Sequence, residues 1–122
     1  MKRDWNIIRA ILLKLEESET PNTVLNAKNL PPFDEQAVAY NIRLLAKSGH
    51  ITANISESHS GDGKINLALA RNLSSTGHEL LDTIRSDTVW GKIQDKVKKD
   101  GLEMTVDVVL MVGRKIMESM LS

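Results

Sequence analysis

Residues 34–51, DEQAVAYNIRLLAKSGHI, decide the fold. The stretch opens on Asp34, whose carboxylate can accept hydrogen bonds from the free amides of a first helical turn. An apolar stripe with the i, i+4, i+7 spacing of a helix comes next, formed by Val38, Ile42 and Leu45. Gly49 stands where a left-handed residue often ends a helix, and Ile51 begins an alternation of period two. The stretch predicts an amphipathic helix followed directly by a strand.

The remaining face of this helix has the chemistry of a DNA-binding surface. The residues predicted to point away from the stripe are Gln36, Ala39, Tyr40, Arg43 and Lys47. In a major groove, Gln36 and Arg43 could reach base edges, while Lys47 and Tyr40 could reach phosphates. The alternative is the ordinary solvated face of an amphipathic helix.

The segment after the helix favours DNA binding. The junction LLAKSGHI, residues 44–51, resembles the LL-x-x-x-G-[LH]-I junction of bacterial winged-helix regulators. Two segments alternate apolar and polar residues and can pair as strands. Their apolar residues are Ile51, Ala53 and Ile55 in the first, and Ile65, Leu67 and Leu69 in the second. A hairpin wing is therefore expected over about residues 51–70, with His59 and Lys64 near its tip as candidate contacts to DNA. A solvated loop is the alternative, because Glu57 and Asp62 offset this positive charge.

The segment before the helix departs from an ordinary helix-turn-helix. Residues 18–33 contain Pro21, Pro31 and Pro32, so only a brief strand near residues 23–25 and a turn are expected. The missing helix normally contacts the DNA backbone and fixes the angle of insertion. This departure weakens the DNA-binding hypothesis.

Helices are predicted on both sides of this central part. Asp4 is the expected cap of a first helix to about Glu17, and Ser74 or Ser75 the cap of a helix after the hairpin. Asp87 is the expected cap of the next helix, whose stripe is Val89, Trp90, Ile93 and Val97. Its lysines, Lys92, Lys96 and Lys99, are interpreted as a solvated row. Residues from about 87 to 122 form a predicted C-terminal helical extension of one winged-helix-like domain.

The last predicted helix, capped by Thr105, is apolar on nearly all sides. One face carries Val106, Val109, Leu110, Gly113, Met117 and Met120, and the back carries Val108, Met111 and Val112. An all-round apolar helix is buried on all sides. We therefore predict a homodimer through this helix, with Val108, Met111, Val112 and Gly113 at the interface. The alternative is a helix packed wholly within its own chain.

Composition excludes several functional classes. The 122 residues include no cysteine, which excludes disulfides and thiolate metal sites. Their 16 basic and 16 acidic side chains count against binding of nucleic acid by bulk positive charge. No apolar run approaches the roughly 20 residues of a membrane span, so a cytoplasmic protein is expected. His78, Glu79 and Asp82 form an HExxD pattern without the second histidine of a zinc-protease helix. We expect no enzymatic activity, metal site or cofactor, and the sequence identifies no small-molecule substrate.

Three segments together resemble a known family. They are MKRDWNIIRAILLKLEE (1–17), VAYNIRLLAKSGHI (38–51) and LSSTGHELLDTIRSDTVWGKI (73–93). They are similar to small proteins from bacteria, phages and prophages that are catalogued as a domain of unknown function with a winged-helix fold. The signatures MKRD-x-x-x-IR-x-IL and GHE-x-LD-x-x-R-x-DT-x-W carry the resemblance, which spans the chain and departs at Asn41, where histidine is usual. It implies the fold and a phage or prophage setting, and it brings no catalytic residues.

The sequence thus predicts an α+β, mostly α, winged-helix domain that binds double-stranded DNA, most simply as a transcriptional regulator. The competing hypothesis is a protein–protein interaction module, such as a phage accessory protein, that keeps the fold without binding DNA. Zero net charge and the missing helix favour the second hypothesis.

Overall fold

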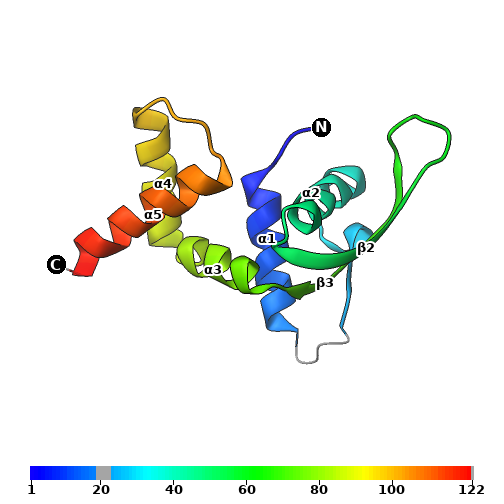
Figure 1. The fold of residues 1–122 in the computed structure, drawn as a ribbon, viewed down its shortest axis with the longest axis horizontal. Helices are drawn as coiled ribbons and strands as arrows, with labels where there is room; N and C mark the ends of the chain where they lie inside the picture. Colours follow the sequence, from blue (N-terminus) through cyan, green and yellow to red (C-terminus); the bar gives the residue numbers. More distant parts are fainter. Residues whose placement is uncertain (19–22, 122) are drawn as a thin grey trace. The chain divides into compact units, whose positions relative to one another are not determined.

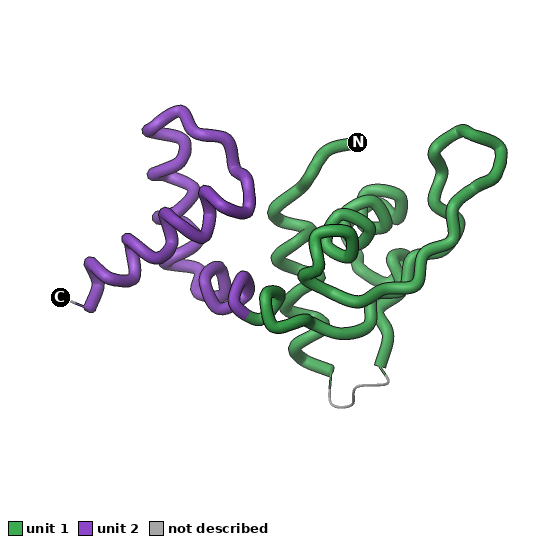
Figure 2. Tube along the Cα trace, viewed as in Figure 1, with its two compact units in different colours: residues 1–78 green, residues 79–122 purple. Residues whose placement is uncertain are grey.

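A computed structural model describes residues 1–18 and 23–121 (Figure 1). Its contacts divide the chain into two compact units, Met1–His78 as unit 1 and Glu79–Ser122 as unit 2 (Figure 2). Among the described residues no helix has the length and apolar character needed to cross a membrane.

Unit 1 is a small sheet covered by helices. Its elements are α1 (Trp5–Glu17), β1 (Leu25–Asn26), the 3-10 turn η1 (Ala27–Asn29), α2 (Glu35–Lys47), β2 (Ile51–Glu57) and β3 (Ile65–Leu73). The strands are antiparallel in the order β1-β3-β2, and the β2–β3 hairpin extends away from α2 at its tip (Figure 1). The described chain is α+β and mostly helical, as predicted. The order is consistent with a winged helix in which η1 occupies the place of the missing helix.

The predicted helix ends of unit 1 are confirmed. The carboxylate of Asp4 accepts hydrogen bonds from the N–H groups of Asn6 and Ile7 at the start of α1. Asp34 accepts from the Ala37 N–H at 3.1 Å at the start of α2. Gly49 follows α2 with φ of 80°, a left-handed conformation that glycine adopts without steric cost. The Asp34 carboxylate therefore fixes the N-terminal end of α2, and the left-handed conformation of Gly49 fixes the C-terminal end.

A buried amide joins α1 to α2. The side chain of Asn41 is fully buried. Its Oδ1 accepts the Asp4 N–H at 3.0 Å, and its Nδ2 donates to the Ala37 carbonyl at 2.8 Å. The position where the chain departs from the family signature thus has a structural role, holding the start of α1 against α2.

The predicted alternation of β3 is wrong in part. Ile65 is buried as expected, but Leu67 is 42% exposed and the next buried residue is Ala68. The register explains the change, because Glu57 pairs with Ile65 whereas the preceding Ser56 pairs with Leu67. Asn66 is thereby left without a partner in β2, and such a bulge exchanges the two faces of a strand.

Unit 2 consists of the end of α3 (Ser75–Ile84), α4 (Asp87–Lys99) and α5 (Val106–Leu121). The predicted α4 stripe is buried, but the cap prediction is wrong. Ser86, not Asp87, is the N-cap and accepts the Val89 N–H at 3.3 Å. Thr105 caps α5 as predicted by accepting the Val108 N–H at 3.2 Å.

The structure corrects half of the predicted dimer face on α5. Val112 is 4% exposed and Gly113 is buried, so both face the interior of unit 2. A Cβ at Gly113 would collide with Thr83 Cγ2, so its lack of a side chain permits close approach of α3 rather than of a partner chain. Val108 is half-buried and Met111 is 44% exposed. Of the four residues predicted for the interface, Met111 is therefore the most exposed.

Candidate nucleic-acid interface

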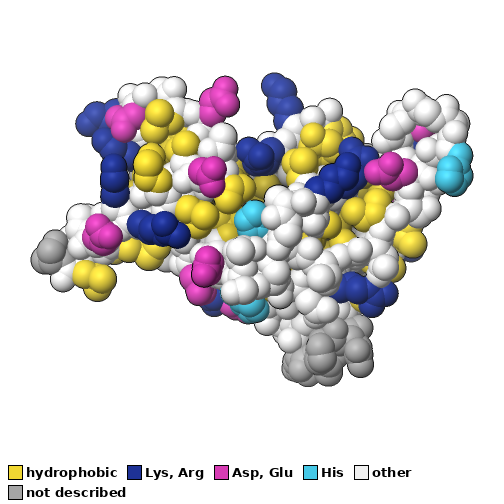
Figure 3. Space-filling model, in the orientation of Figure 1, with side chains coloured by type: hydrophobic (Ala, Val, Ile, Leu, Met, Phe, Trp, Pro, Cys, Tyr) yellow, Lys and Arg dark blue, Asp and Glu magenta, His cyan; other side chains and the backbone are white. Residues whose placement is uncertain are grey.

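A groove of about 530 Å³ lies between the C-terminal half of α2 and the outer half of the wing. Its lining residues are Arg43, Lys47, Ile55, Ser56, Glu57, Ser58 and His59. Three of these, Arg43, Lys47 and His59, are among the predicted DNA contacts. In the space-filling view, basic and acidic side chains lie close together around α2 and the hairpin, rather than as a continuous basic surface (Figure 3).

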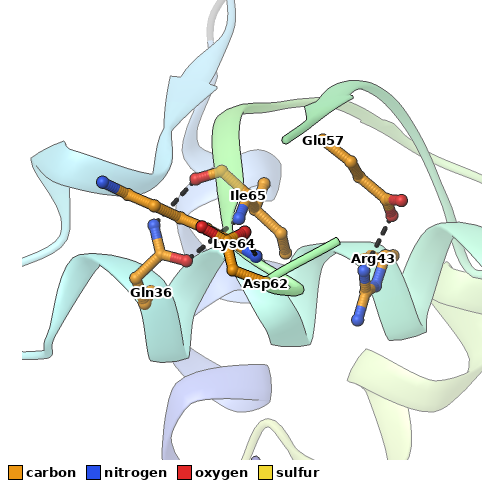
Figure 4. Close-up of polar contacts among 6 residues, drawn as sticks. All are labelled: Gln36, Arg43, Glu57, Asp62, Lys64 and Ile65. Carbon is orange, nitrogen blue, oxygen red and sulfur yellow. Dashed lines mark hydrogen bonds and ion pairs between the residues drawn. The ribbon is translucent and has the colours of Figure 1, made fainter. Parts of the chain in front are cut away.

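Arg43 is the central side chain of this groove. Its Nη1 donates to the Glu57 carboxylate at 2.7 Å, which joins α2 to the end of β2 (Figure 4). The guanidinium lies 5.4 Å from the centre of the Tyr40 ring, within the range of a cation–π contact. Its side chain remains 22% exposed. Arg43 is thus oriented by two contacts while one side remains open to a ligand.

Glu57 carries a negative charge into the groove. The hydrogen bond from Arg43 and the Arg43 charge lower the pKa of Glu57, and the Lys47 charge adds to the effect. The carboxylate is therefore ionised at neutral pH and offsets one of the two cations contributed by α2. Residue spacing does not reveal that a side chain of α2 pairs with a side chain of β2. The sequence therefore identified Glu57 only as a charge on the wing.

Gln36 has a different role from the predicted one. Its Nε2 donates to the Ile65 carbonyl at 2.7 Å, and the Ile65 N–H donates to its Oε1 at 3.1 Å (Figure 4). Both polar atoms of the amide are engaged with the first residue of β3. Gln36 fastens the wing to α2, so a contact with a base would compete with these two hydrogen bonds.

Of the other residues predicted to contact DNA, one is buried and two are exposed. Ala39 is 2% exposed, so the prediction that it faces outward is wrong. Helix α2 contacts α1, η1, β2 and β3, and its buried face is therefore wider than one stripe. Lys47 and Lys64 are exposed, but Lys64 does not line the groove.

The wing tip is organised by hydrogen bonds of its own. The Ser58 N–H donates to the Lys64 carbonyl at 2.8 Å, and the Lys64 N–H donates to the Asp62 carboxylate at 2.9 Å. The latter bond is the main reason that the pKa of Asp62 is lowered. The Ser58 and Ser60 hydroxyls lie 2.7 Å apart. His59, which lines the groove, lies between these hydrogen-bonded residues.

Comparison with known families assigns the chain. Residues 2–103 match the family described as a hypothetical protein, DUF2513. The chain belongs to the DUF2513 family. A relative from Haemophilus influenzae strain Rd, described as an uncharacterized protein, is 38% identical over 122 residues, which is 100% of both chains. No solved structure matches.

The HExxD pattern of this DUF2513 chain lies away from the groove residues in sequence, on α3. His78 and Asp82 are exposed, and Asp82 accepts a hydrogen bond from Arg85 at 2.9 Å. Among residues 1–18 and 23–121, no three histidine, aspartate or glutamate side chains are grouped so as to hold a metal ion. The pairing of Asp82 with Arg85 supports a surface role for this part of the pattern.

Proposed function

We propose that this protein binds double-stranded DNA through the exposed half of α2 and the wing. The observation that carries the proposal is the groove in which Arg43 and Lys47 of α2 meet His59 and two serine hydroxyls of the wing. Cations supplied from a helix, together with hydroxyl and imidazole groups of a hairpin, are the groups that contact phosphates and base edges in DNA complexes.

Each group has a distinct task in this proposal. Arg43, already oriented over Tyr40, exchanges Glu57 for a guanine edge or a phosphate. Lys47, at the C-terminal end of α2, contacts a phosphate, and the wing residues Ser58 and His59 contact the adjoining backbone. Regulation of transcription, in the phage or prophage setting that the resemblance implies, is the role we assign to such a domain.

The test is fluorescence anisotropy with random-sequence duplex DNA at low and physiological salt. We expect salt-sensitive binding, and we expect Arg43→Ala and Lys47→Ala each to reduce the salt slope by about 1. At a site selected from a library, Arg43→Ala should cost about 1–3 kcal/mol. The matched control is Lys98→Ala, which removes the same charge from exposed α4 and should leave binding unchanged. Absence of binding at low salt would refute the proposal.

A protein–protein interaction module is the second candidate, and one contact favours it. The Arg43–Glu57 pair already neutralises a cation that DNA binding requires, in a chain with no net charge. Affinity capture with the tagged chain at low salt distinguishes the two functions. A stoichiometric protein partner without bound nucleic acid would select the interaction module.

A further inference from the structure

We propose that the exposed face of α5 pairs with the same face of a second copy, antiparallel, about a two-fold axis at Met111. The surface is a hollow of about 430 Å³ along the helix, lined by Asp107, Leu110, Met111, Arg114, Lys115 and Glu118. All of its lining residues belong to unit 2, the purple part of the chain in Figure 2, and none of them lines the groove proposed for DNA.

The apolar part of the face is a small patch around Met111. Met111 is 44% exposed and Leu110 beside it is half-buried. Met111 also lines a neighbouring groove of about 240 Å³ that includes Leu102 and Ile116, and Leu102 is 42% exposed. Apolar surface thus continues from α5 toward the segment before it, and a partner helix laid across Met111 would cover it.

The charges on this face of α5 complement those of a second copy only when the two helices are antiparallel. Asp107 and Lys115 each lie four residues from Met111, on opposite sides of it and on the same face. In an antiparallel pair centred on Met111, Asp107 of each copy lies opposite Lys115 of the other, so two attractive contacts flank the apolar patch. A parallel pair would oppose Asp107 to itself and Lys115 to itself.

The free chain leaves these charges available. Within the described part of the chain, Asp107, Arg114, Lys115 and Glu118 form no ion pair. Asp107 has Leu110 and Met111 at i+3 and i+4, so its own helix offers no cation one turn further on. A second copy supplies that cation.

The pair should be weak. Helix α5 has 16 residues, and one helix face buries less than the roughly 1,200 Å² of a standard specific interface. Sedimentation velocity of the full chain from about 10 to 500 μM at low salt is therefore the appropriate measurement, with association expected in the upper part of that range. No DNA is present, so the result does not depend on the proposed function.

Charge exchange provides the decisive experiment. Asp107→Lys and Lys115→Asp alone should each weaken self-association by at least about 10-fold, because each creates two repulsive contacts. The double variant carrying both changes should return to within about 3-fold of the wild type, and an equimolar mixture of the two single variants should form a heterodimer. Positions 107 and 115 are too far apart on one helix to interact, so only pairing between copies explains such recovery.

Two further variants keep the result interpretable. Glu118→Lys makes the same charge change on the same face, but lies seven residues from Met111 and outside the paired section, so it should leave association unchanged. Met111→Lys, at an exposed site, should abolish association while circular dichroism shows an intact fold. A wild-type monomer up to 500 μM, unaffected single variants, a double variant that does not recover, or disruption by Glu118→Lys would each overturn the pairing.

Discussion

At Gly77 the backbone of α3 lies directly against the turn that ends α2. A Cβ at this position would collide with the backbone carbonyl oxygen of His50, which cannot rotate away. The contact is reinforced by the Ser74 N–H, which donates to the same carbonyl at 3.0 Å. Gly77→Ala should therefore lower the free energy of unfolding by about 1–3 kcal/mol, measured by urea denaturation.

A glycine in α4 provides the control for this substitution. No heavy atom lies within 4 Å of the place where a Cβ at Gly91 would stand. Gly91→Ala should stabilise the chain by up to about 1 kcal/mol, since alanine has the higher helix propensity. Equal effects at the two positions would contradict the close-approach explanation for Gly77.

His50 makes stability depend on pH. Burial lowers the pKa of His50 below its reference value of 6.5. Its Nδ1 lies 2.9 Å from the Ser48 hydroxyl. As pH falls through 6.5 the unfolded chain takes up a proton that the folded chain resists, so stability present above this pH is progressively lost down to the folded pKa.

The variant His50→Asn should reduce this pH dependence. Urea denaturation at pH 7.5, 6.5 and 5.5 would show a smaller fall in the free energy of unfolding than in the wild type. The control is His59→Asn, which replaces an exposed histidine of the wing. This variant should keep the wild-type change of the free energy of unfolding with pH. Identical slopes in wild type and His50→Asn would assign the dependence to other groups.

Most residues whose role is set by their sequence neighbours were predictable, the cap at Asp87 excepted. Asp4, Asp34 and Gly49 act on a helix end within four residues, and the structure has them as expected. Gln36 and Ala39 depend on which distant elements pack against α2. Spacing alone placed Ala39 wrongly and could not predict the hydrogen bonds of Gln36 to Ile65. The candidate site was therefore located by sequence, but its individual contacts required the fold.

At the scale of elements, one glutamine fixes the wing to α2. The Gln36 amide makes two hydrogen bonds with the backbone of Ile65, where β3 begins. Gln36→Ala should raise the hydrogen-exchange rate of the Ile65 amide and lower the free energy of unfolding by about 1–3 kcal/mol, because buried backbone groups lose their partner. Gln94→Ala, at an exposed site on α4, should change neither quantity.

The hairpin shows where sequence patterns stop being sufficient. The period-two pattern correctly predicted two paired strands, although the predicted span of about residues 51–70 ends before β3 does at Leu73. It could not predict the irregular pairing near Glu57, because a bulge changes which face a residue occupies without changing the residue types. Leu67 is consequently exposed at 42%, despite an apolar alternation that predicts burial.

At the scale of the whole molecule, net charge decides how strongly the chain attracts DNA. With 16 basic and 16 acidic residues, net charge contributes no attraction to DNA, so affinity depends on where the charges lie. The groove concentrates two cations of α2 beside one carboxylate. Glu57 is thus both the partner that orients Arg43 and a charge that repels a phosphate.

Replacing this carboxylate separates the two effects. Glu57→Gln gives the chain a net charge of about +1, keeps an acceptor near Arg43 and removes the repulsion. DNA affinity at low salt should rise by about 2- to 10-fold and the gain should shrink at physiological salt, since exposed charges are screened. Anisotropy titrations at both salt concentrations measure this, with Glu118→Gln as the control that changes net charge equally outside the groove. Equal gains from the two variants would assign the effect to net charge, whereas a loss with Glu57→Gln would show that Glu57 is needed to hold Arg43 in place for binding.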